Sequence, residues 1–80
     1  MLDKLVSRDI EEFCNLMNVI AMKYSKIGKH GTAIDWLRKA IKHIDNIPKA
    51  KTITFNNLAC IYREQANLPM ALLYISKAQK

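Results

Sequence analysis

Apolar residues recur every three or four positions through most of this 80-residue chain. In the first third they follow a single stripe: Val6, Ile10, Phe13, Met17, Ile20, Tyr24 and Ile27. This spacing is typical of one face of an α-helix and does not fit a strand. The stripe continues upstream to Leu2 and Leu5. Gly28 is the expected end of the helix, because glycine readily takes the left-handed conformation that follows a helix C-terminus. Asp9 and Glu12, inside the stripe, have the spacing of a capping box.

Three more helices are predicted downstream. The second has a broad apolar face made of Ala33, Ile34, Trp36, Leu37, Ala40, Ile41, Ile44 and Ile47. We expect Asn46 and Pro48 to end it, because proline disfavours helical backbone in the residue before it. The third helix carries an apolar stripe over residues 55–62, and the fourth starts at residues 67–69, with Pro69 at an early helical position. Short turns within each pair require the two helices of the pair to lie antiparallel.

The two halves of the chain repeat one pattern. Seven positions of like size and character recur with an offset of 38 residues. In the first half they are Met17, Ile20, Ala21, Tyr24, Ala33, Leu37 and Ala40, and in the second half they are Phe55, Leu58, Ala59, Tyr62, Ala71, Ile75 and Ala78. Small residues let two helices approach where they cross, and the large residues fill the space beside the crossing. The sequence therefore predicts two copies of one helix-turn-helix unit.

This repeated pattern resembles that of the tetratricopeptide repeat (TPR) family, over residues 14–42 and 52–80. The second unit is similar to repeats of the kinesin-light-chain type. The resemblance implies an all-α fold, with two antiparallel helix-turn-helix units stacked as a short right-handed α-solenoid. One domain would then span residues 1–80, with a helical extension over 2–13, repeat 1 over about 14–47 and repeat 2 over about 52–80. Three features depart from the family pattern: Met17 replaces the usual Trp or Leu, Ala66 replaces a turn glycine, and the period is 38 rather than about 34 residues.

Charge is distributed unevenly along the chain. The formal net charge is +6, yet residues 1–12 carry four acids against two bases. A basic patch follows in the middle of the chain, formed by Arg38, Lys39, Lys42, Lys49 and Lys51. Such a patch attracts phosphates or acidic partners, or is simply a solvated helix face.

Residues with catalytic or metal-binding chemistry are few and poorly spaced. Cys14 and Cys60 show no CxxC or Cys/His spacing, so we expect two free thiols that act as small buried or half-buried side chains. His30, Asp35 and His43 form no helix-spaced metal pair and no nucleophile elbow, and His30 is expected to serve packing. We therefore expect no enzymatic activity, no cofactor and no metal.

The location of the protein is also suggested by its hydropathy. The longest apolar runs are far shorter than the roughly 20 residues that span a bilayer, so no membrane span is expected. The N-terminus has early acids and no apolar stretch, unlike a secretory signal. These features favour a cytoplasmic protein, and the kinesin-light-chain likeness implies an association with the cytoskeleton or with motors.

The TPR resemblance also implies where a partner would bind. In that family a concave surface is lined by the first helix of each pair. The residues expected there are Asn15, Asn18, Val19, Met22 and Lys26 in the first unit, and Ile53, Asn56, Asn57, Cys60, Arg63 and Glu64 in the second. In members that bind extended peptides, an asparagine at the place of Asn57 often hydrogen-bonds the peptide backbone, and an amide both donates and accepts. Alternatively, Asn56 and Asn57 merely solvate an exposed helix face.

Three functions follow from these features. The first is a protein–protein interaction module, a scaffold or adaptor that binds a peptide or helix in the concave groove, as part of a larger protein or as a self-assembling unit. The second is nucleic-acid binding through the basic patch. The third is homo-oligomerisation, as a homodimer or by continuation of the repeat array. Its basis is that apolar residues of the last helix would otherwise face water: Met70, Leu72, Leu73 and Ile75.

Overall fold

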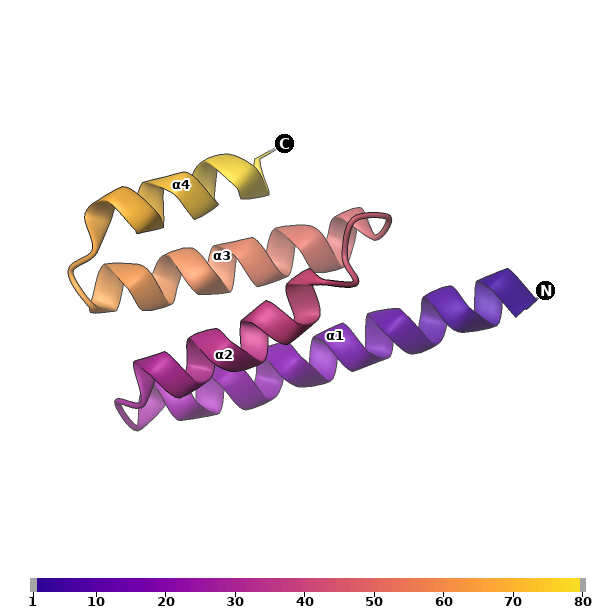
Figure 1. Cartoon of the computed structure of the whole chain (residues 1–80), viewed down its shortest axis with the longest axis horizontal. Coiled ribbons are helices and arrows are strands. Elements are labelled where there is room, and N and C mark those ends of the chain that lie inside the picture. The colour runs from indigo at the N-terminus through magenta and orange to yellow at the C-terminus, as the bar shows by residue number, and fades with distance from the viewer. Residues whose placement is uncertain (1, 80) are drawn as a thin grey trace.

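A computed structural model describes the backbone of residues 2–79 and the side chains of residues 8–79. Within that range the chain forms four helices and no strand: α1 (Leu2–Lys26), α2 (His30–Ile41), α3 (Pro48–Glu64) and α4 (Leu68–Ala78). The predicted all-α class is therefore confirmed. Figure 1 shows that α1 and α2 form one antiparallel hairpin and that α3 and α4 form a second. α3 also contacts α1 and α2, whereas α4 contacts α3 alone among the described helices.

The first hairpin turns at Gly28, as the sequence predicts. Gly28 has a φ of +84°, in the left-handed region. The N–H of Lys29 donates across it to the carbonyl of Tyr24 at 2.9 Å, which satisfies one of the last helical carbonyls of α1. This is the Schellman arrangement. α1 itself runs without interruption through Asp9 and Glu12, so these residues lie inside the helix and the expected capping box does not form.

The second hairpin uses the same turn without a glycine. Ala66 has a φ of +61°, and the N–H of Asn67 donates across it to the carbonyl of Tyr62 at 2.8 Å. Ala66 follows Gly28 by 38 residues, so the repeat extends to backbone conformation at the turn. The side chain of Asn67 then caps α4 by accepting a hydrogen bond from the backbone N–H of Met70.

The connection between the hairpins differs from the prediction. α2 ends at Ile41, not at Asn46, and a short irregular segment over residues 42–47 follows. Ile44 within that segment is only 1% exposed. The chain must reverse direction so that α3 can lie beside α1 and α2, and tight turns keep Ile44 directed into the core while the backbone leaves the helix. Pro48 does not terminate α2 but begins α3, where its missing N–H has no helical partner to lose.

The core lies between the hairpins and along each helix crossing. The fully buried large side chains include Leu37, Leu58 and Ile61, and the small residues Ala21, Ala33 and Ala40 are completely covered at the crossings. Burial is much lower at the open side of the second hairpin. Ile75, which follows Leu37 by 38 residues, is 38% exposed, since among the described helices only α3 packs on α4.

Candidate functional site

A groove of about 490 Å³ runs between α1 and α3. Its eight lining residues include every residue that the sequence analysis places on the concave surface of the first unit. They are Asn15, Asn18, Val19, Met22, Lys23 and Lys26 from α1, and Ile53 and Asn57 from α3. Most of the exposed surface that lines the groove is apolar, and because two of the eight residues are lysines and none is an acid, its charge is positive where α1 ends.

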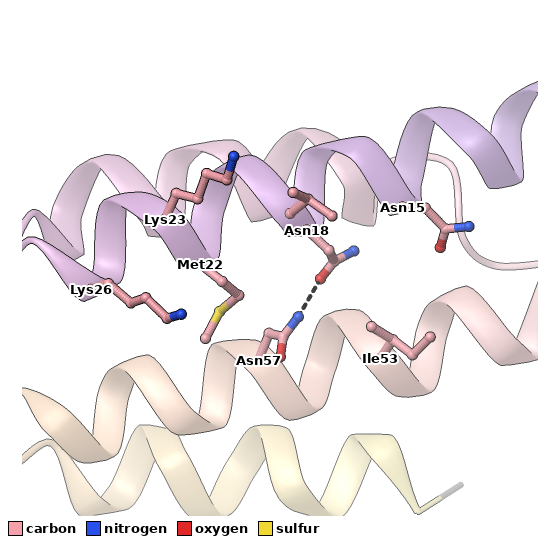
Figure 2. Close-up of a pocket in the computed structure, with 8 residues that line it drawn as sticks. Asn15, Asn18, Met22, Lys23, Lys26, Ile53 and Asn57 are labelled. Carbon is pink, nitrogen blue, oxygen red and sulfur yellow. Dashed lines mark hydrogen bonds between the residues drawn. The ribbon is translucent and has the colours of Figure 1, made fainter.

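Two asparagines join α1 to α3 at the floor of this groove. Asn57 Nδ2 donates to Asn18 Oδ1 at 2.8 Å (Figure 2). Asn18 Nδ2 donates in turn to the backbone carbonyl of Cys14 at 2.8 Å and to Thr54 Oγ1 at 2.9 Å. Asn18 is only 5% exposed, and both of its N–H groups are engaged. Its role in the structure is therefore to connect the two helices and to orient Asn57.

Asn57 itself has hydrogen-bonding capacity to spare. It is half-buried, and its bond to Asn18 uses one N–H of its amide. Among the described residues no partner engages its Oδ1 or its second N–H. An amide with one free donor and one free acceptor is suited to pair with a peptide unit.

The other groove residues surround Asn57 with apolar surface and positive charge. Figure 2 shows Met22 reaching from α1 toward α3 beside Asn57, and Ile53 reaching back from α3 one turn away. Lys26 extends along the groove toward Met22, whereas Lys23 points away from α3 at the outer edge. Lys23 is not among the residues that we expected here, although its position one helical turn after Val19 places it on this side of α1.

Three residues that we expected on the same surface line a different hollow. Asn56, Cys60 and Arg63 lie with Ala59 and Ile75, on the side of α3 that faces away from α1. The reason is helical geometry: adjacent residues differ by about 100° around the helix, so Asn56 and Asn57 face different sides. In the 38-residue repeat, Asn56, Cys60 and Arg63 are equivalent to three residues of α1 that face α3, namely Asn18, Met22 and Ser25.

Glu64, also expected on the concave surface, instead connects the end of α3 to the first hairpin. Its Oε2 lies 2.9 Å from His30 Nε2 and 3.3 Å from the Ser25 hydroxyl. The hydrogen bond from His30 lowers the pKa of the Glu64 carboxyl, with a smaller contribution from Ser25, while partial desolvation acts in the opposite direction. His30, which we expected to serve packing, therefore takes part in a polar contact at the surface.

No family model, curated protein or solved structure matches this chain.

The basic patch lies outside the groove. Its residues occupy the end of α2, the segment that follows and the start of α3, and all but Lys51 are exposed. Lys39 Nζ sits 4.4 Å from the ring centroid of Trp36, so its charge is partly engaged by an aromatic face. The patch therefore lies at the surface near the connection between the two hairpins.

Residues expected to mediate self-association lie on α4. Leu72, Leu73 and Ile75 are exposed and Met70 is half-buried. Leu72 is 66% exposed, while Ile34, 38 positions earlier, is 7% exposed. At this repeat position, therefore, the first hairpin is covered by the rest of the described chain, whereas the second hairpin is largely exposed.

The side chains of residues 8–79 bring together no group of three potential metal ligands among His, Cys, Asp and Glu. Both cysteines are free thiols, Cys14 buried and Cys60 half-buried. Burial raises the pKa of the Cys14 thiol, which keeps it protonated, and its S–H points to the backbone carbonyl of Ala40 at 3.8 Å. No helix in the described part of the chain is long and apolar enough to cross a bilayer.

Proposed function

We propose that this chain is a non-catalytic protein-interaction module of the TPR type, which binds a short acidic peptide segment in the groove between α1 and α3. The observation that carries the proposal is the composition of that groove. A half-buried amide with unused hydrogen-bonding groups, Asn57, lies between apolar side chains and a lysine. Peptides are recognised by this combination of backbone hydrogen bonding, apolar contact and a charge at one end.

The nature of the peptide follows from the order of residues along the groove. Met22 and Ile53 would contact an apolar side chain, since both present apolar surface on either side of Asn57. Lys26 lies toward the end of α1 and would pair with a carboxylate of the ligand. Because no acid lines the groove, a basic peptide would find no compensating charge there.

Assignment to the TPR type is supported by the repeat itself. Two hairpins built on the same offset of 38 residues also share one turn geometry, at Gly28 and Ala66. Right-handed stacking, a cytoplasmic location and use as a scaffold or adaptor belong to this proposal as consequences of the TPR likeness.

A peptide array tests the proposal directly. Ten-residue peptides would share one leucine-containing core, flanked by acidic, neutral or basic residues, and binding would be measured by fluorescence anisotropy. Acidic peptides should bind most tightly, and K26E should reverse the preference in favour of basic peptides. Equal binding of all three peptide classes, or no change of preference in K26E, would contradict the proposal.

The role of Asn57 has a matched control in its neighbour. N57A should weaken binding of the acidic peptide about tenfold, the loss expected for a pair of hydrogen bonds to the peptide backbone. N56A removes the same side chain from an exposed position outside the groove and should leave binding within about twofold. Circular dichroism would verify that both variants keep the helical fold.

The nucleic-acid alternative predicts a different result in the same assay. If the basic patch were the functional surface, duplex DNA would bind at low salt and be released steeply as salt rises. K42E/K49E would abolish that binding, whereas K26E and N57A would not. Binding of the acidic peptide that survives K42E/K49E would favour the groove.

A further inference from the structure

The outward side of α1 carries a stripe of residues that are exposed, apart from the half-buried Ile20. Leu16 is 54% exposed and Ile27, directly after the helix, is 67% exposed. We define the outer stripe as Asp9, Glu12, Leu16, Ile20, Lys23 and Ile27, which follow one another at steps of three or four residues. Phe13 and Val19 flank it, 40% and 54% exposed. Exposed apolar side chains gathered on one helix face and bordered by charged ones are typical of an interface.

The charges on this stripe are segregated by sign. The acids Asp9 and Glu12 lie on its N-terminal half, and Lys23 lies on its C-terminal half. Asp9 and Lys23 are each seven residues from Leu16, which corresponds to about 10.5 Å along the helix axis. A two-fold axis at Leu16 therefore places Asp9 of one copy opposite Lys23 of another, and the reverse contact forms by symmetry.

We propose that two copies of this chain pair through the outer stripes of their α1 helices, in antiparallel orientation about Leu16. The two Leu16 side chains would meet on the axis, and Ile20 of each copy would lie against the methylene groups of Glu12 of the other copy. Glu12 lies one turn from Asp9 and can reach the same lysine of the second copy. An isologous contact of this kind closes on itself and gives a dimer instead of a fibre.

The surface relief of α1 is consistent with this symmetry. One shallow hollow, lined by Asp9, Ile10, Phe13 and His43, lies on the N-terminal side of Leu16. A second, lined by Ile20, Lys23, Tyr24 and Ile27, lies on its C-terminal side. Rotation about Leu16 brings each hollow of one copy over the opposite hollow of the other, so Lys23 would enter the hollow beside Asp9.

A second copy fits this face better than an unrelated partner because the charge pattern is complementary to itself only in the antiparallel sense. Parallel pairing would place acids against acids and lysines against lysines. The exposed side of α4 provides no such pattern, since its described side chains include Lys77 and no acid. α1, not α4, is therefore the helix on which the structure specifies a partner.

Analytical ultracentrifugation of the whole chain tests the apolar half of the contact. L16E should raise the dissociation constant of the dimer at least about tenfold, because two carboxylates would meet on the axis. L72E, at a similarly exposed leucine on α4, is the matched control and should leave the dimer intact. Dissociation by L72E but not by L16E would overturn the proposal, as would a monomer at every concentration up to about 1 mM.

A charge exchange tests the antiparallel arrangement. D9K/E12K and K23E should each be monomeric, since either change places like charges opposite each other in both halves of the contact. An equimolar mixture of the two variants should form a heterodimer, because each lysine again faces an acid. All three positions are exposed, so the helical fold should be unaffected, and circular dichroism would verify this. Dimers of either variant alone, or a mixture that stays monomeric, would overturn the arrangement.

This dimer and the peptide groove are separately testable. Val19 and Lys23 border both, whereas Asn57 and Lys26 belong to the groove and Leu16 to the outer stripe. N57A should thus remain dimeric.

Discussion

Asn57 Nδ2 lies 2.8 Å from Asn18 Oδ1, and this hydrogen bond connects an amide that faces the groove to an amide that is buried between the hairpins. Through Asn18 the contact extends to Thr54 on α3 and to the backbone of Cys14 on α1. The orientation of the candidate ligand-binding side chain therefore depends on the packing of one hairpin against the other. A network of this kind is stabilising when each member is paired and costly when one partner is lost.

The first prediction concerns Asn18. N18D preserves the shape of the side chain but removes both N–H donors and buries a carboxylate next to a carbonyl oxygen. We expect a loss of about 2–4 kcal/mol in the free energy of unfolding, and about 1–3 kcal/mol for N18A. Urea denaturation followed by circular dichroism would measure both.

Asn15 supplies the control for this prediction. It is exposed on the same helix about one turn earlier, so N15D should change stability by less than about 0.5 kcal/mol. If N18D were as stable as N15D, the hydrogen bonds of Asn18 would contribute nothing and the assigned network would be wrong.

The second prediction concerns the two equivalent turns. Ala66 occupies left-handed backbone that costs an alanine about 1–2 kcal/mol, so A66G should stabilise the fold by about 0.5–1 kcal/mol. G28A should destabilise it by about 1 kcal/mol. Space is not the cause, because a Cβ at Gly28 would meet no atom within 4 Å.

Replacement of Gly31 is the control that distinguishes backbone strain at Gly28 from a general effect of replacing glycine by alanine. Gly31 lies in the first turn of α2 and its φ is not positive. As at Gly28, an added Cβ would meet no atom within 4 Å. G31A should raise stability by about 0.5–1 kcal/mol, because alanine favours the helix. Thermal unfolding of the three variants side by side would show whether G28A and G31A shift the midpoint in opposite directions, as this explanation requires.

These turns illustrate what could be predicted from the sequence. The end of α1 follows from Gly28 and from helical periodicity, and the shared offset predicts the matching turn even though Ala66 lacks the usual residue type. The α1 wall of the groove was also predictable, because one helix face can be computed from spacing. Asn56 and Asn57 line different hollows, and only the placement of α3 against α1 decides which of these two adjacent residues faces the groove.

The segment between the hairpins shows a second limit of periodicity. Ile44 continues the apolar spacing of α2, and nothing in that spacing distinguishes a further helical turn from a series of tight turns that keep one side chain in the core. The reversal of the chain before Pro48 depends on contacts between residues far apart in sequence. Tertiary packing therefore determines where α2 ends.

The third prediction follows from that segment. Ile44 lies outside every helix but is almost completely buried, so I44A should create a cavity and cost about 2–4 kcal/mol in the free energy of unfolding. Leu73 is 44% exposed inside α4, and L73A should cost far less, at most about 1 kcal/mol. Guanidinium denaturation would compare them, and a negligible effect of I44A would mean that this connection is not anchored in the core.

The fourth prediction concerns the contact between Glu64 and His30. The hydrogen bond from His30 lowers the pKa of Glu64, so the folded chain favours the carboxylate. Its contribution is therefore present above the ordinary glutamate pKa of about 4.3 and is lost as the pH falls through the lower value of the folded state. The glutamine in E64Q cannot titrate. The difference in the free energy of unfolding between the natural chain and E64Q should therefore shrink as the pH falls through that acidic range.

Urea midpoints measured from neutral pH down to about pH 3 would reveal this convergence. H30A identifies its cause, because removing the histidine removes the donor that lowers the Glu64 pKa. In the H30A background the further change E64Q should leave a much smaller pH-dependent difference, the behaviour of two residues that act through one contact. If the pH-dependent difference in stability that E64Q causes persisted unchanged without His30, the pH dependence would come from another neighbour of Glu64. The Ser25 hydroxyl, 3.3 Å from Glu64 Oε2, would then be the next residue to replace.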